Sequence, residues 1–153
     1  PGSTVWVSNG TYSTGARAAW GAMSNRVVVD KELRLRSVNG AADTVILGAR
    51  GMATNGIGAG AIRCIYLTNT VVLDGFTLSD GFTLATGDSV HERSGGGVWA
   101  EAGAVVTGCH VQGCAASADG GGAYGGHYTD CRFVGNRAAQ GGGVYSGRVE
   151  NSG

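Results

Sequence analysis

Four ionisable residues gather in one connecting segment, Gly81 to Ser94. They are Asp88, His91, Glu92 and Arg93. Carboxylates, an imidazole and a guanidinium in one loop could supply an acid, a base and an anion-binding group to a substrate. The same residues are also typical of a solvated insertion, because surface loops are rich in polar side chains. The sequence leaves both interpretations open, and we assign no catalytic residue.

Other acidic residues do not converge in the way that pectin-type hydrolases require. In the repeat alignment given below, Asp74 and Glu150 share a column but belong to the first and last copies, and Asp130 lies one column over. A calcium-dependent lyase would need three or more carboxylates together with a basic residue. His110 and His127 are isolated, which favours surface histidines over metal ligands. We therefore expect no metal site and no cofactor.

Four aromatic residues recur at one place in each repeat: Tyr66, Trp99, Tyr124 and Tyr145. The residue before each of them is apolar, so strand alternation would turn the rings outward into a vertical stack. Such a stack could be a platform for sugar rings or a contact strip for a second rod-like molecule. It could equally stabilise its own sheet, as cross-strand aromatic pairs do. A bulge among the neighbouring glycines would instead bury the rings.

The four cysteines are of two kinds. Cys109 and Cys131 occupy one inward column in adjacent copies, at a Cα separation of about 4.8 Å, within range of a disulfide. They could also stack as reduced thiols, because buried cysteine packs as a small hydrophobic residue. Cys64 aligns with Gly97, and Cys114 aligns with Gly81 and Asn136 at a corner; their spacing matches no zinc motif. We expect Cys109 and Cys131 to stack in the core, bonded or not.

A short pattern, written four times between Ala61 and Gly153, positions these residues. Each copy has a strand-like pair ending on the aromatic residue, and in the last three copies the pair follows a glycine triplet (95–97, 120–122 and 141–143). A second strand-like stretch follows in each copy. The aromatic positions 66, 99, 124 and 145 are 33, 25 and 21 residues apart, so the strands keep their register while the loops shorten. This pattern indicates a solenoid.

Stacking the copies in register predicts parallel strands about 4.8 Å apart and inward apolar columns. The columns are Ile65/Val98/Ala123/Val144, Leu73/Val106/Tyr128/Val149 and Leu78/Val111/Phe133. No stretch has a capped helical period. We predict one all-β domain over residues 1–153, a parallel β-helix of about five or six coils, right-handed because such crossovers take that hand. Residues 1–60 would form irregular coils and residues 61–153 regular ones.

The first sixty residues carry weaker strand signals. Strands are expected at 4–8, 26–30, 31–37 and 44–48, where apolar residues alternate or run together. In the third of these, Leu33 and Leu35 would share one face. The alanine-rich stretch 15–25 could be a loop or one helical turn, and 49–60 is expected to be a glycine-rich loop.

Composition excludes several classes of protein. Eleven basic and eleven acidic residues give a formal charge of zero, so nothing favours a nucleic-acid partner or an anionic membrane. The 30 glycines follow no Gly-X-Y period and there is one proline, which excludes collagen. An apolar share of 42% argues against disorder. No apolar run is long enough to predict a membrane span.

Three phrases carry a resemblance to a known family: residues 5–12 (VWVSNGTY), 72–78 (VLDGFTL) and 95–99 (GGGVW). They resemble right-handed parallel β-helix repeat proteins of bacterial surface and secreted type, including those with polymorphic outer-membrane-protein-like repeats. The resemblance covers nearly the whole chain and implies an extracellular or cell-surface location. It supplies no catalytic residue, because this scaffold carries polysaccharide lyases, pectin-type hydrolases, adhesins and passenger domains.

Two classes of function follow from these observations. The neutral charge and the lack of acidic clusters favour a non-catalytic structural or adhesive solenoid. The alternative is a carbohydrate-active enzyme or sugar-binding module on the same scaffold, with polysaccharide as its partner.

The two ends of the chain predict further contacts. A β-helix normally needs a polar cap at each end, because an open end presents unpaired backbone groups and an apolar cross-section. The sequence starts at Pro1 with a strand close behind and stops within the strand-like stretch 148–153, with no capping helix. It was either cut from a longer solenoid, or its open ends meet between subunits. The second case predicts end-to-end association into a fibre.

Overall fold

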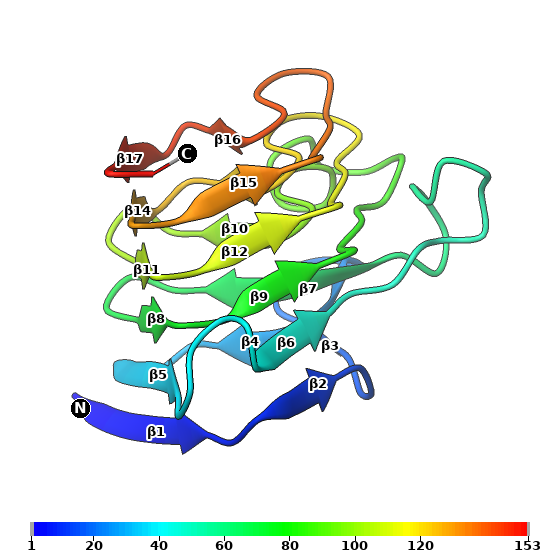
Figure 1. Cartoon of the computed structure of the whole chain (residues 1–153). Helices are drawn as coiled ribbons and strands as arrows, with labels where there is room; N and C mark the ends of the chain where they lie inside the picture. The colour runs from blue at the N-terminus through cyan, green and yellow to red at the C-terminus, as the bar shows by residue number, and fades with distance from the viewer. Residues whose placement is uncertain (1, 153) are drawn as a thin grey trace.

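Short strands follow from the sequence, because each alternating apolar stretch is only a few residues long before a glycine or polar corner ends it. The computed structural model describes residues 2–152, and within that range the chain is all-β, without a helix. It has 17 strands in three open sheets of six, six and five strands. The strands of each sheet lie one above another along a common axis (Figure 1).

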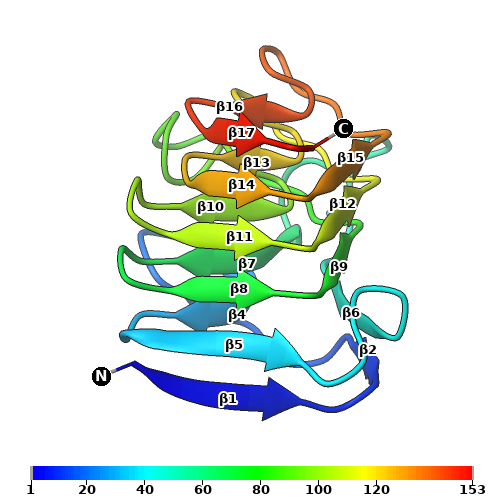
Figure 2. The ribbon, with the colours of Figure 1, turned by 60° about the vertical axis from the view of Figure 1, so that its left-hand side comes forward.

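The first sheet has six strands, and all of its pairings are parallel (Figure 2). In order across the sheet they are β1 (Ser3–Val7), β5 (Leu33–Ser37), β8 (Val72–Asp74), β11 (Val105–Thr107), β14 (His127–Thr129) and β17 (Arg148–Glu150). The predicted column Leu73/Val106/Tyr128/Val149 is confirmed residue by residue. Leu35 and then Val5 extend this column toward the N-terminus.

The second sheet contains the strands of the aromatic pairs. Its order is β16 (Val144–Tyr145), β13 (Ala123–Tyr124), β10 (Val98–Ala100), β7 (Ile62–Leu67), β4 (Ser24–Val29) and β3 (Arg17–Ala18). Its pairings confirm the column Ile65/Val98/Ala123/Val144. All of them are parallel except the pairing of β3 with β4. β3 pairs antiparallel with the start of β4, so residues 15–25 form a small hairpin and no helical turn.

The third sheet has five strands and is parallel throughout. Its order is β15 (Arg132–Val134), β12 (His110–Gln112), β9 (Thr77–Ser79), β6 (Thr44–Leu47) and β2 (Gly10–Tyr12). The column Leu78/Val111/Phe133 is confirmed, with Ile46 added before it. The strands expected at 26–30, 31–37 and 44–48 are β4, β5 and β6, with bounds shifted by one or two residues. Leu33 and Leu35 both pack against the core, as alternation predicts.

One core of buried apolar side chains contains residues from all three sheets. The glycine triplets bring successive layers close together around it. A Cβ on Gly97 would lie 2.6 Å from the Gly122 carbonyl oxygen and 3.0 Å from the Cys114 Sγ, so this corner admits only glycine. In the last copy the equivalent Gly143 has nothing closer than the Phe133 Cβ at 3.7 Å. The third glycine of each triplet is therefore required where another layer follows.

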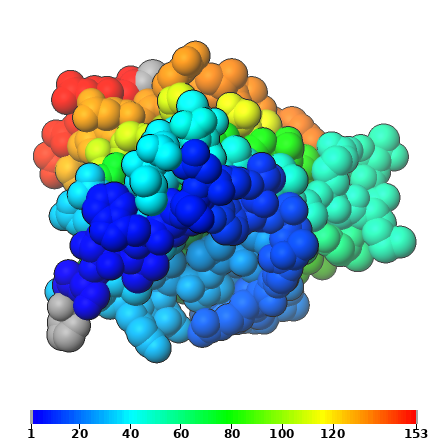
Figure 3. Space-filling view, turned by 60° about the horizontal axis from the view of Figure 1, so that its bottom comes forward, coloured from blue at the N-terminus to red at the C-terminus, as the bar shows by residue number. Residues whose placement is uncertain are grey.

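The inward column of the first sheet ends in an exposed apolar side chain at each end of the stack. Val5 in β1 is 44% exposed and Val149 in β17 is 43% exposed, whereas Leu73 and Val106 between them are fully buried. Figure 3 views the N-terminal end, which the first strands cross. Beneath them are two hollows of about 270 and 200 Å³, each lined mainly by apolar side chains such as Val27 and Leu35. The small hairpin covers only the start of β4, because β3 pairs with its first two residues.

Candidate functional site

An aromatic column runs along the outward face of the second sheet. β7, β10, β13 and β16 each contribute one ring, and the rings come in register: Tyr66, Trp99, Tyr124 and Tyr145. Ring centroids are 4.7 Å apart for the first pair and 6.0 Å apart for each of the next two pairs. The interplanar angles are 5°, 15° and 20°, so the rings stack. The predicted vertical stack is confirmed.

The column is only partly open to solvent. Tyr66 is 8% exposed and Trp99 is 6% exposed, whereas Tyr124 and Tyr145 are half-buried. Each ring also stacks against its neighbour, so the ring faces on which a sugar would stack are already covered. The interpretation as an exposed four-ring platform therefore fits the structure poorly. Solvent reaches mainly the last two rings.

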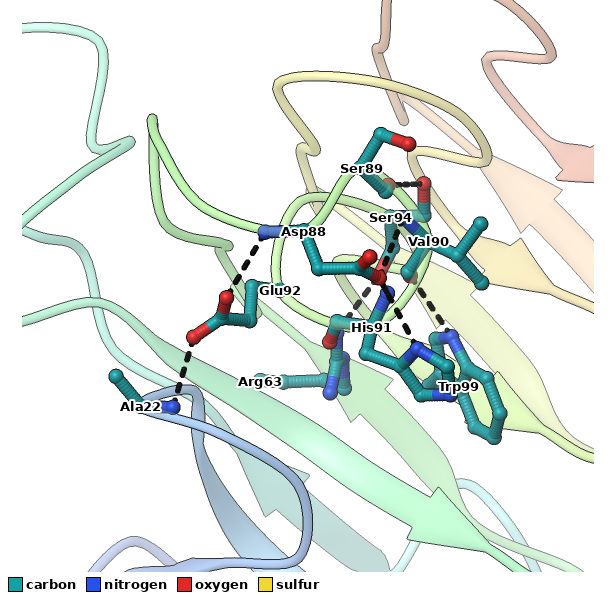
Figure 4. A network of polar contacts seen from close by, with 9 residues as sticks. All are labelled: Ala22, Arg63, Asp88, Ser89, Val90, His91, Glu92, Ser94 and Trp99. Carbon is teal, nitrogen blue, oxygen red and sulfur yellow. Dashed lines mark hydrogen bonds and ion pairs between the residues drawn. The ribbon is translucent and has the colours of Figure 1, made fainter.

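The segment Gly81–Ser94 packs onto this column (Figure 4). The His91 ring lies between two tryptophans, with its centroid 4.3 Å from that of Trp20 and 4.9 Å from that of Trp99. The Trp99 indole Nε1–H donates a hydrogen bond to the Val90 carbonyl oxygen at 2.9 Å. The segment is therefore no freely solvated insertion. It joins two features that the sequence presented as separate, the ionisable cluster and the aromatic strip.

Asp88 organises the turn that carries His91. Its Oδ2 accepts the backbone N–H of Val90 at 3.1 Å and that of His91 at 2.7 Å, and it lies 3.0 Å from the His91 Nδ1. The His91 backbone and then its ring lower the pKa of Asp88, because both hydrogen-bond to the charged carboxylate. An Nδ1–H donated to Asp88 leaves the Nε2 of His91 able to accept a proton, an arrangement that general bases use.

Glu92 and Arg93 have other roles. The Glu92 carboxylate accepts the backbone N–H of Asp88 at 2.9 Å and that of Ala22 at 2.8 Å (Figure 4). These two hydrogen bonds lower its pKa and fasten the segment to the β3–β4 hairpin. The Arg93 Nε donates to the Ser117 Oγ at 3.1 Å, in the next copy. The structure therefore brings Asp88 and His91 together and places Glu92 and Arg93 as fasteners.

A buried arginine that the sequence reasoning did not single out supports the base of the segment. Arg63 in β7 is 1% exposed. Its guanidinium donates to the carbonyl oxygens of Gly95 (2.7 Å), His91 (2.8 Å) and Ser94 (2.7 Å), and to the Asn25 Oδ1 (3.0 Å). Within residues 2–152 no carboxylate lies at ion-pair distance from it, and burial lowers its pKa to about 9. Its signal in the sequence is a lone charge inside the apolar strand IRCIYL.

A groove of about 430 Å³ lies beside the column. Its lining includes Asn69, His91, Trp99, Glu101, Tyr124 and Ser146. The Glu101 Oε1 accepts the Asn69 backbone N–H at 2.7 Å. Burial and then Glu101 raise the pKa of Tyr66, and burial, Asp119, Tyr145 and Asp88 raise that of Tyr124, so both phenols stay neutral. Only this copy has an acidic residue after the aromatic strand. Glu101 therefore belongs to no repeated pattern, and the repeats could not predict its role.

The remaining histidines are exposed to solvent to some degree and lie apart from this groove. His127 lies 2.6 Å from the Glu150 carboxylate through its Nε2, and this contact, followed by Arg148, lowers the pKa of Glu150. His110 is in β12, opposite Thr77 and Arg132. In the part of the chain that the structure describes, no three His, Cys, Asp or Glu side chains gather as metal ligands would.

All four cysteines are buried as unbonded thiols. Cys109 and Cys131 lie in adjacent layers, where the Arg132 N–H donates to the Cys109 carbonyl oxygen at 3.0 Å, so the expected core stacking is confirmed without a disulfide. Cys114 belongs to a corner column in which it accepts the Gly81 N–H through its Sγ at 3.4 Å. Cys64 lies beside Cys114, and burial and then this neighbour raise its pKa well above the ordinary value.

Thiol labelling is expected to be slow in the native protein. Burial raises the pKa of Cys109 to about 12 and also raises that of Cys131, so little thiolate forms near neutral pH. Reaction with an aromatic disulfide reagent should label none of the cysteines quickly before denaturation and all four quickly after it. Fast native labelling of Cys109 or Cys131 would show that their column is not in the core.

Acid is expected to loosen the segment over Trp99. Asp88 and Glu92 have lowered pKa values in the folded protein, so their contribution is present above their ordinary values of 3.8 and 4.5. It is lost as the pH falls through the lower, folded pKa values. The Trp99 indole N–H resonance should move in this range as its bond to Val90 weakens, while the Trp6 indole resonance should stay. A Trp99 signal that stays unchanged after both carboxylates have been protonated would contradict this role for them.

Comparisons with protein-family models, with characterised proteins and with solved structures find no match to this chain. Among the residues described, no helix has the length and apolar character needed to cross a lipid bilayer.

Proposed function

We propose that the chain is a right-handed parallel β-helix. Its support is the cyclic order of the strands. From β1 onward the chain visits the first, the third and the second sheet in turn, and it repeats that order to β17. The right hand rests on the general preference of parallel crossovers, which take it in about 98% of cases.

We infer that this β-helix is a non-catalytic structural or adhesive rod of a secreted or cell-surface protein. The observation that carries the inference is that the outward aromatic rings stack on one another instead of facing solvent. Their faces stack from Trp20 to Tyr145, and the ionisable segment is fastened over them by Arg63 and Glu92. Such features stabilise a rod along its axis. The location rests on the resemblance to surface and secreted β-helix repeat proteins.

Self-association would take place through the ends of the rod. Val5 and Val149 terminate the same inward column and are both exposed. If β17 of one copy paired in parallel with β1 of another, Val149 would lie opposite Val5 and the column would continue without a break. Apolar surface would be buried and unpaired edge groups would be satisfied at the same contact. The zero formal charge adds no long-range repulsion.

Sedimentation velocity over a range of concentrations tests this contact. The wild-type chain is expected to grow in mass with concentration. The Val149→Glu variant should remain monomeric, because it places a charge in the apolar end. Met52→Glu is the control, since Met52 is 89% exposed in the loop between β6 and β7 and takes no part in β1 or β17, and it should associate like the wild type. A wild-type chain that stays monomeric at all concentrations would refute the end contact.

A carbohydrate-active enzyme is the second candidate, favoured by one observation. Asp88 and His91 form a hydrogen-bonded pair at the rim of the groove. Incubation with anionic and neutral polysaccharides, followed by analysis of reducing ends and unsaturated products, separates the candidates. A structural rod releases no product. Product formation that His91→Gln abolishes and Glu32→Gln leaves intact would favour the enzyme.

A further inference from the structure

We propose that the groove beside the aromatic column binds a saccharide bearing a protonated amine, of the glucosamine type. This binding site goes beyond the structural role proposed above and does not depend on end-to-end association. The groove volume of about 430 Å³ lies within the range of small-molecule sites, roughly 300–1,000 Å³. Its lining combines aromatic edges with several polar groups, as such sites do.

The first argument is a carboxylate with an unused oxygen. Glu101 lines the groove, and its Oε1 is held by the Asn69 backbone N–H at 2.7 Å. Its Oε2 has no hydrogen-bond donor among residues 2–152. The Asn69 side chain is fixed in turn, because its Oδ1 accepts the Gly103 N–H at 2.8 Å. Glu101 is therefore oriented by the protein and has one oxygen available to an ammonium group.

The second argument is the sign of the surrounding charge. Asp88 and Asp119 do not line the groove, but both lie close enough to Tyr124 to raise the pKa of its phenol, so further negative charge lies near the groove. No lysine or arginine is among the residues that line the groove. The nearby Arg63 is buried with four hydrogen-bond acceptors around it, and Arg93 is turned to Ser117. The His91 Nδ1 is paired with Asp88. The charge therefore favours a cation over a neutral or anionic sugar.

The third argument is a set of hydroxyl groups suited to a saccharide. Tyr124 and Ser146 both line the groove. Ser146 has φ of +58°, a left-handed conformation that costs a non-glycine residue free energy, whereas the equivalent place in the previous copy is Gly125 at +70°. A serine in that position presents a hydroxyl where glycine would be easier for the backbone. Sugar hydroxyls and an ammonium group together match this donor and acceptor set.

Isothermal titration calorimetry of the full chain tests the proposal with two matched probes. One is a hexamer of β-1,4-linked glucosamine in mildly acidic buffer, where the amines are protonated, and the other is its N-acetylated counterpart. The glucosamine hexamer is expected to bind at least about tenfold more tightly, because only it offers an ammonium group to Glu101. Added salt should narrow the difference.

Two variants connect the binding to the groove. Glu101→Gln keeps the shape of the side chain and should reduce glucosamine binding about tenfold, whereas Glu32→Gln, on an exposed side chain elsewhere, should leave it unchanged. Tyr124→Phe should reduce binding a few-fold through loss of one hydroxyl. Unchanged melting temperatures show that each variant is folded.

Three results would overturn the proposal. They are an absence of binding to either hexamer, equal binding to both, and glucosamine binding that Glu101→Gln does not weaken. Equally tight binding of an oligolysine of the same charge would show that charge alone is recognised, and the saccharide class would then be wrong. None of these results bears on the end contact, which sedimentation measures separately.

Discussion

Replacing Arg63 by methionine is expected to lower the free energy of unfolding by about 4 kcal/mol. The substitution keeps an unbranched side chain of similar length but removes every donor of the guanidinium. It leaves the Asn25 Oδ1 and the carbonyl oxygens of His91, Ser94 and Gly95 without their partner. A buried acceptor that loses its donor costs about 1–3 kcal/mol, and relaxation of the segment should recover part of the sum.

Urea denaturation measures this change, and Arg34→Met is its control. Arg34 lies in β5, a parallel strand like β7, but its side chain is exposed. Its replacement should therefore change the free energy of unfolding by no more than about 0.5 kcal/mol. The Trp99 indole resonance should also shift in Arg63→Met, because the segment that holds it is no longer fastened. A loss below about 1 kcal/mol would mean that Arg63 is not the support of this segment.

Replacing Gly97 by alanine is expected to destabilise the protein by about 3 kcal/mol. The added Cβ would meet the Gly122 carbonyl oxygen at 2.6 Å, the Val111 Cγ1 at 2.9 Å and the Cys114 Sγ at 3.0 Å. The Gly122 carbonyl belongs to the next layer, and Val111 and Cys114 belong to the core, so relief requires neighbouring layers to separate. The strain is steric, since the backbone of Gly97 is not in the left-handed region.

Gly143→Ala provides the control at the equivalent position of the last copy. Its Cβ would meet only the Phe133 Cβ at 3.7 Å, an ordinary contact, so stability should change by no more than about 0.5 kcal/mol. Thermal and urea unfolding of the two variants under the same conditions give the comparison. Equal effects at the two positions would contradict the close stacking of the layers at this corner.

The parallel registers were predictable because each strand repeats at a fixed place relative to its aromatic residue. One slip would turn the apolar side chains outward, so the register of Leu73, Val106 and Tyr128 is strongly specified. The same logic placed Cys109 and Cys131 in adjacent layers of the core. It also predicted the stacking of the aromatic rings, because rings in register on parallel strands must lie above one another.

The packing of the segment Gly81–Ser94 could not be predicted in the same way. Asp88, His91 and Trp20 come from connections without periodicity, and their meeting depends on tertiary structure. Three of the four acceptors of Arg63 are backbone carbonyls, whose positions no residue type predicts. The covering of Trp99 follows from these contacts. Of the interpretations that the sequence left open, it disfavours the exposed platform, and the aromatic rings form a mostly closed column with a groove beside it. The closeness of Cys64 and Cys114 was missed because Cys64 lies in β7, whereas Cys114 follows β12 in the next repeat.

The proposed structural and binding roles are compatible because they would use different parts of the molecule. The end contact uses the inward columns at β1 and β17. The groove uses outward side chains of the second sheet and the corners that follow it. A rod built from many copies would therefore display one groove per copy along its side. Repeated weak sites on one rod can bind a polymer far more tightly than a single site can.

Fibre diffraction from aligned, concentrated protein tests most directly whether the chain is a β-helical rod that grows end to end. The strands run across the axis of the stack, so end-to-end growth predicts filaments with a strong reflection at about 4.8 Å parallel to the fibre axis. Val149→Glu should give neither the filaments nor the oriented reflection, and Met52→Glu should give both. Monomer-sized particles from the wild-type chain, or filaments whose 4.8 Å spacing lies across the axis, would contradict the proposed assembly.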